Sequence, residues 1–113
     1  MNEPIHRSLA QGRWFTFSLA EQLANVGSEV ERAARWRQRG EREHFEKALD
    51  RMLELLDLTI ADPRWQRSRR LKELVRLREV LCDFFCGDNV YGTKLEDLQK
   101  YFLYFGIAAR ANR

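Results

Sequence analysis

Apolar residues recur at steps of three and four along most of this chain, and this spacing restricts the chain to a helical fold. In the first such stretch the recurring positions are Leu19, Leu23, Val26, Val30 and Ala33. Residues three and four apart share one face of an α-helix, whereas a half-buried strand needs strict alternation, which no window of the sequence shows. The spacing therefore predicts an amphipathic helix with one buried face.

Residues that begin and end helices divide the chain into four such segments. Ser18 with Glu21, and Thr93 with Glu96, have the spacing of a capping box, in which two side chains satisfy the free amides of a helix start. Residues that end helices follow the first three apolar stretches, at Gly40, Pro63 and Gly87. We therefore expect helices over about residues 18–39, 41–62, 68–86 and 93–111.

Short connections between helices of similar length favour antiparallel neighbours. The sequence thus predicts an all-α fold, an antiparallel up-down four-helix bundle. With 113 residues, the whole chain (1–113) is expected to form a single domain. Residues 1–17 precede the first helix, and we expect them to form an arm. Its aromatic residues would pack across the bundle, because exposing them would reduce solubility: Trp14, Phe15 and Phe17.

The composition excludes several classes of protein. At 44% hydrophobic and 33% charged residues, the chain has a globular rather than a disordered composition. No run approaches the roughly 18 apolar residues of a membrane span, and the first residues lack the apolar core of a signal peptide, so a cytoplasmic location away from membranes is expected. The two cysteines, Cys82 and Cys86, and the two distant histidines do not have zinc-site spacing, so neither metal nor cofactor is expected.

Basic residues collect at one end of the expected bundle, where the arm, the second connection and the C-terminus would meet. Arginine side chains neutralise phosphates, and an aromatic ring beside them can stack on an unpaired base. We therefore predict a surface that binds RNA or DNA, made of Arg13, Arg64, Trp65, Arg67, Arg69, Arg70 and Lys72. The alternative is an ordinary solvated end, whose arginines pair with helix C-terminal carbonyls or with the C-terminal carboxylate.

The segment 101–109 is apolar nearly all the way round. A helix of this kind is either central or covered by a partner, and a four-helix bundle has no central helix. We therefore predict a homo-oligomer, or a complex with a protein partner, whose interface includes Tyr101, Phe102, Tyr104 and Phe105. The alternative is that the aromatic arm covers these residues within one subunit.

The sequence has no motif that would assemble a catalytic site, so no catalytic residue is predicted. Arg39 and His44 have the Arg-x-x-x-x-His spacing of HEPN-type ribonucleases, but Gly40 breaks the helix between them, and chance is the better account. One strip of polar residues on the first helix fits either a buried structural network or the lining of a pocket: Gln22, Asn25, Ser28, Glu29 and Arg32.

A resemblance supports the basic surface. The segment from Ala48 to Phe85, especially Leu55–Leu58, Arg70–Leu74 and Arg78–Leu81, resembles small prokaryotic four-helix-bundle proteins. It is similar to the ribosomal intervening-sequence bundle proteins and to accessory proteins of diversity-generating retroelements. The resemblance implies a ring-like oligomer with a basic surface for nucleic acid and a polymerase partner.

These observations lead to three hypotheses about function. The first is a non-enzymatic, oligomeric helical accessory protein that binds nucleic acid through its basic end. The alternative is a protein–protein interaction module, such as an antitoxin or an assembly subunit, that uses its last helix. The third is a HEPN-like ribonuclease.

Overall fold

Four α-helices follow a short 3₁₀ turn in the computed structural model, which describes residues 12–111. The turn η1 spans Arg13–Thr16, and the helices are α2 (Leu19–Gln38), α3 (Arg42–Ile60), α4 (Arg69–Cys86) and α5 (Leu95–Ala111). No strand occurs within the described residues. The all-α class and the four predicted helices are therefore confirmed, and every helix end lies within two residues of its expected position.

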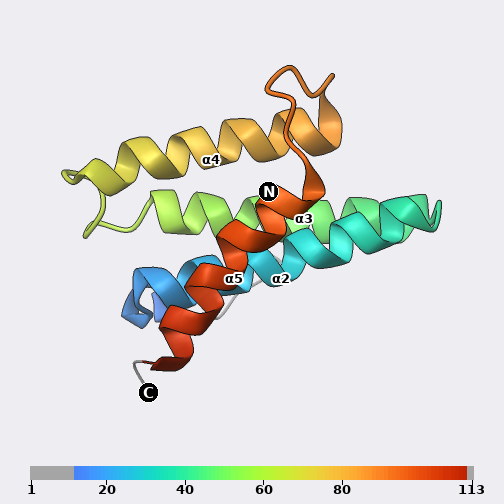
Figure 1. The fold of residues 1–113 in the computed structure, drawn as a ribbon. Coiled ribbons are helices and arrows are strands. Elements are labelled where there is room, and N and C mark those ends of the chain that lie inside the picture. The colour runs from blue at the N-terminus through green and yellow to red at the C-terminus, as the bar shows by residue number, and fades with distance from the viewer. Residues whose placement is uncertain (1–11, 112–113) are drawn as a thin grey trace, which may run out of the picture.

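The helix around which the others are organised is α2. It packs against both α3 and α5, and α4 packs against α3. Figure 1 shows α2, α3 and α4 lying roughly alongside one another, whereas α5 crosses α2 obliquely. A regular antiparallel up-down bundle is therefore not confirmed, because α5 packs mainly across α2 instead of lying parallel to α4.

The core lies where α3 and α5 meet the two sides of α2. The apolar stripe predicted on the first helix is buried there, and every α-helix contributes to the same cluster. Gly27 of α2 is buried against Phe102 of α5, and the missing side chain allows the two helices to approach closely. An ion pair on the rim joins α3 to α4, with 2.7 Å between Arg78 Nε and Asp57 Oδ1.

The start of α2 is the predicted capping box. The Ser18 hydroxyl accepts a hydrogen bond from the Glu21 amide at 3.1 Å, and the Glu21 carboxylate accepts one from the Ser18 amide at 3.0 Å. Both free amides are thereby satisfied at the point where the apolar stripe begins. This prediction is confirmed.

The second predicted capping box, Thr93 with Glu96, is wrong. The Thr93 amide donates to Asn89 Oδ1 at 2.9 Å, so it is not available to the Glu96 carboxylate. The Asn89 side chain also donates to the Thr93 carbonyl at 2.9 Å. These two hydrogen bonds between Asn89 and Thr93 hold the connection before α5. The helix begins at Leu95, two residues after Thr93.

Most of the predicted arm, residues 1–11, lies outside the described residues. Its described part is η1, in which Trp14 is fully buried and Phe15 and Phe17 are partly buried against the core. Trp14 packs edge-on against Phe17, with 5.5 Å between the ring centres.

None of the helices in the described region is long and apolar enough to cross a membrane.

Candidate functional site

The connection between α3 and α4 is built around the buried carboxylate of Asp62. Arg64 donates to it from the backbone amide (3.0 Å to Oδ1), from Nε (3.1 Å to Oδ1) and from Nη2 (2.7 Å to Oδ2). The same Nη2 donates to the Phe17 carbonyl at 2.5 Å, which ties the connection to the segment before α2. Burial alone would raise the pKa of Asp62, but hydrogen bonds from Arg64 and Gln22 and the charge of Arg64 lower it below 3.8.

Gln22 of α2 joins this carboxylate to both tryptophans of the region. Its amide nitrogen donates to Asp62 Oδ2 at 2.9 Å and to the Trp14 carbonyl at 3.0 Å. Its amide oxygen accepts from the Trp65 indole at 3.0 Å. The Trp14 indole donates to the Thr59 hydroxyl at 3.0 Å, so η1, α2, α3 and the connection share one network.

We call these six residues the Asp62 network: Trp14, Gln22, Thr59, Asp62, Arg64 and Trp65. Two of them, Arg64 and Trp65, belong to the predicted nucleic-acid surface. The Arg64 guanidinium is bonded to Asp62 and lies 4.6 Å from the centre of the Trp65 ring. Both side chains therefore already hold this end of the fold together, and their role in binding nucleic acid stays a prediction.

Four of the five remaining cations of the predicted surface are exposed around the first turn of α4. We call them the α4 cationic turn, and they are Arg67, Arg69, Arg70 and Lys72. Arg70 forms an ion pair with Glu73 at 3.6 Å. Among the described residues, the other three have no hydrogen-bond or ion-pair partner through their side chains. The first turn of α4 contains no acidic residue, and the Ser68 hydroxyl caps it by accepting from the Arg70 amide at 3.1 Å.

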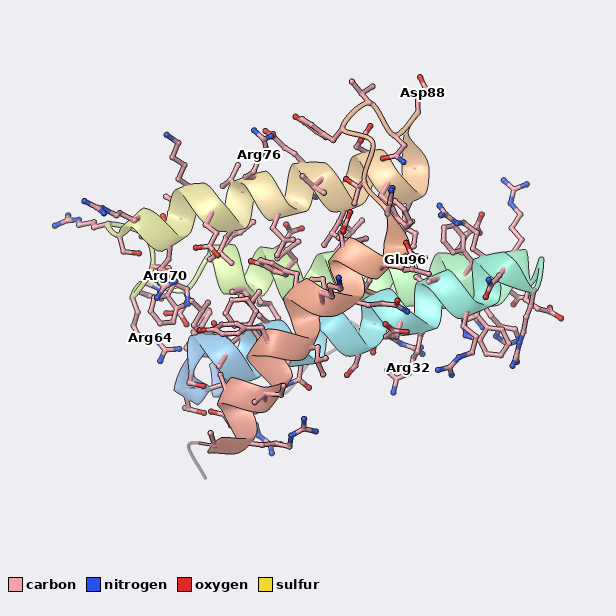
Figure 2. All side chains as sticks on the ribbon, viewed as in Figure 1. Arg32, Arg64, Arg70, Arg76, Asp88 and Glu96 are labelled. Carbon is pink, nitrogen blue, oxygen red and sulfur yellow. The ribbon has the colours of Figure 1, made fainter. Side chains whose placement is uncertain are left out.

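Figure 2 shows Arg64 and Arg70 at the same end of the molecule, beside the connection between α3 and α4. Arg13 is exposed in η1, next to Trp14, whose indole reaches Thr59 near the end of α3. The tertiary structure thus brings Arg13 to the end that carries the α4 cationic turn.

The polar strip on α2 does not act as one unit. Gln22 belongs to the Asp62 network, whereas Asn25 and Ser28 donate to carbonyls of their own helix, those of Glu21 and Ala24. Glu29 is buried and accepts from Arg32 at 2.5 Å, and its second oxygen has no partner among the described residues. Gln22 therefore belongs to a structural network, whereas Glu29 forms a separate ion pair with Arg32, whose side chain is partly exposed.

Arg39 and His44 lie at the junction of α2 and α3, on the ring of Trp36. The His44 ring stacks on Trp36 with 4.5 Å between centres, and the Arg39 guanidinium lies 5.5 Å from the same ring. Both side chains are exposed. A HEPN-like site here stays a prediction, and the aromatic contacts account for both side chains without it.

The predicted interface residues of α5 divide between the core and the surface. Phe102 and Phe105 are only 7% and 9% exposed, so they belong to the core of the single chain. Tyr101 is half-buried and donates to Glu73 Oε1 at 3.1 Å; burial and the Glu73 charge raise its pKa. Tyr104 is exposed, together with two residues that we did not predict, Leu103 and Ile107.

A signal for these two residues was present in the sequence. The core positions of α5 follow at steps of four and three, at Leu98, Phe102, Phe105 and Ala109. That stripe places Leu103 and Ile107 on the opposite face of the helix. The apolar composition of the segment 101–109 as a whole conceals the difference between its two faces.

The cysteines of α4 are unpaired thiols, with Cys82 partly buried and Cys86 exposed. Burial raises the pKa of the Cys86 thiol, and the neighbouring Cys82 adds to this effect. No cluster of histidine, cysteine or acidic residues within residues 12–111 could hold a metal ion.

Comparisons of this chain with protein-family models, with curated proteins and with solved structures find no match. The resemblance to small prokaryotic bundle proteins therefore stays a prediction, and the functional argument depends on the geometry of the chain itself.

Proposed function

We propose that this chain is a non-enzymatic accessory protein that binds nucleic acid through the α4 cationic turn. The observation that carries the proposal is the absence of acidic residues from the first turn of α4, where four exposed cations surround the helix start. Partial positive charge at a helix start favours acidic side chains and disfavours basic ones, by roughly 0.3–1 kcal/mol for each charge. This arrangement therefore costs stability, and bound phosphate would compensate for the cost.

The chemistry of this surface fits the phosphate backbone rather than the bases. The guanidinium groups of Arg67 and Arg69 and the ammonium group of Lys72 are unengaged among the described residues, so they are available to phosphate oxygens. The Trp65 indole donates to Gln22, and its ring is covered by Arg64, so stacking on a base would break existing contacts. Contacts limited to phosphates position a nucleic acid without reading its sequence. We therefore propose sequence-independent binding of RNA or DNA.

The test is a titration with labelled single- and double-stranded RNA and DNA at several salt concentrations. The informative variant is Arg67→Glu/Arg69→Glu. Its matched control is Arg35→Glu/Lys94→Glu, which changes the net charge equally at exposed residues outside the surface. We expect steeply salt-dependent binding that the first variant loses and the control keeps, with unchanged circular dichroism. Absence of binding at low salt, or equal loss in both variants, would refute the proposal.

A second candidate function is protein binding through α5. It is favoured by the exposed side chains of Leu103, Tyr104 and Ile107, which are 58%, 68% and 54% accessible on one helix. A contiguous apolar patch on a small domain marks an interaction surface more often than scattered apolar residues do. A homo-oligomer, an antitoxin pair and an assembly subunit are all forms of this function. Tyr104→Glu should dissociate such a complex and leave affinity for nucleic acid unchanged.

A further inference from the structure

The outer face of α5 combines an apolar centre with charged ends. Its residues follow at steps of four and three, the spacing of a single helix face that meets another helix: Glu96, Lys100, Leu103, Ile107 and Arg110. All five are exposed, and Tyr104 lies beside the apolar centre. This face is therefore acidic at its first position, apolar in its middle and basic at its last.

The two end charges have no ion-pair partner within the described part of the chain. Glu96 does not cap α5, because the Thr93 amide donates to Asn89 instead. Neither Glu96 nor Arg110 has an ion-pair partner among residues 12–111. Each suits the dipole of its own helix end, but both side chains remain free for a charged group outside the described chain.

A groove runs beside this face, between α2 and α5. Its volume is about 350 Å³, and its walls include Ala24 and Ser28 of α2 and Leu103, Gly106 and Arg110 of α5. A side chain at Gly106 would meet no atom within 4 Å, so this part of the groove is open. The surface thus presents protruding apolar side chains beside a groove. In a two-fold dimer, the apolar side chains of each copy can pack toward the groove of the other.

We infer that the partner of α5 is a second copy of this chain, bound with the two α5 helices antiparallel and the two-fold axis at Leu103. This inference rests on the proposal that α5 binds protein. Glu96 lies seven residues before Leu103 and Arg110 seven residues after it. An axis at Leu103 therefore places Glu96 of each copy opposite Arg110 of the other.

The charges distinguish this arrangement from its alternative. A parallel pair of α5 helices would set Glu96 against Glu96 and Arg110 against Arg110, and like charges repel. In the antiparallel pair both contacts are attractive. Lys100 lies beside the apolar centre, where its stem covers apolar surface while the ammonium group stays in water.

The test is sedimentation equilibrium of the full chain without nucleic acid, over a range of protein concentrations. We expect a reversible dimer that Leu103→Glu dissociates. Val90→Glu is the matched control, because Val90 is an apolar side chain that is 82% exposed outside α5. Circular dichroism and thermal melts serve to check that each variant is folded.

A charge exchange tests the orientation. Glu96→Arg and Arg110→Glu should each weaken the dimer about tenfold, because each replaces two attractive contacts with repulsive ones. The double variant Glu96→Arg/Arg110→Glu should restore the dimer. A chain that stays monomeric at all concentrations, or a double variant as weak as the single ones, overturns the inference.

The experiment separates this inference from the proposed functions. A monomeric chain that still binds nucleic acid would overturn the dimer and leave the α4 cationic turn unaffected. A monomer that forms a Tyr104-dependent complex with a different protein would identify α5 as a binding surface for another partner, and would overturn the inference of a second copy.

Discussion

Gly27 of α2 and Phe102 of α5 lie so close together that a β-carbon built on Gly27 would lie 2.6 Å from Cβ of Phe102. This contact fixes the crossing of the two helices. Phe102 Cβ is attached directly to the backbone of α5, so rotation of the ring cannot relieve the clash.

Gly27→Ala should therefore destabilise the protein, although alanine favours a helix more than glycine does. Overpacking a core costs about 1–3 kcal/mol. Gly106→Ala is the matched control, because its new methyl group would meet nothing and the helix should gain roughly 0.5–1 kcal/mol. Urea unfolding of both variants in a Leu103→Glu background removes any contribution from association. Equal effects of the two substitutions would contradict the close approach.

Gln22 holds two tryptophans and one carboxylate through a single side chain. Gln22→Leu keeps a similar volume but leaves the Trp65 indole and the Trp14 carbonyl without their partner. Each buried polar group that loses its partner costs roughly 1–3 kcal/mol, so we expect clear destabilisation in urea unfolding. In a double-mutant cycle, Trp65→Phe should cost less in the Gln22→Leu background than in the wild type. Additive effects would show that the two side chains are not coupled.

The lowered pKa of Asp62 makes stability dependent on pH in the acidic range. The unfolded chain takes up a proton near pH 3.8, whereas the folded carboxyl, bonded to Arg64 and Gln22, resists protonation until lower pH. The stabilisation is therefore complete well above pH 3.8 and is lost as pH falls from that value through the folded pKa. Unfolding free energies measured from pH 6 to pH 2.5 should fall less steeply in Asp62→Asn than in the wild type. Asp50→Asn, at an exposed position on α3, should keep the wild-type slope.

Arg64 and Arg67 lie three residues apart in the same connection, but they should respond differently to substitution. Arg64→Ala removes the partner of a buried carboxylate and a bond to the Phe17 carbonyl, so we expect a loss of about 2–3 kcal/mol, moderated by the partial exposure of the guanidinium. Arg67→Ala should change the unfolding free energy by less than about 0.5 kcal/mol. The same variant should lower the salt slope of nucleic-acid binding by about one. Thermal melts and titrations of both variants test this division of roles.

The sequence by itself determined the elements of this fold. Apolar steps of three and four, the Ser18 capping box and the helix-ending Gly40 and Gly87 are local signals, and each acts within one turn of helix. These signals predicted the helices closely. They failed at Thr93, where Asn89 in the preceding connection took the amide that the capping box needed.

The sequence also predicted where cations are dense, but not which of them are free. The sequence alone does not distinguish the three arginines of the segment 64–69, which are Arg64, Arg67 and Arg69. Asp62 is buried against Gln22 of a distant helix, and this contact engages Arg64 while leaving Arg67 and Arg69 exposed. The core and outer faces of α5, in contrast, follow from the spacing of its apolar residues, whereas the close approach of Phe102 to Gly27 of α2 is set by the tertiary structure.

Helix formation depends on neighbours within four residues, so the linear order of side chains is sufficient to specify it. The oblique crossing of α5 and the Asp62 network depend on which helix faces fit together. That fit is set by side-chain volume and hydrogen-bond satisfaction between residues such as Gln22 and Asp62, 40 positions apart, and Gly27 and Phe102, 75 positions apart. For this reason, only the tertiary structure decided the crossing of α5 and the Asp62 network.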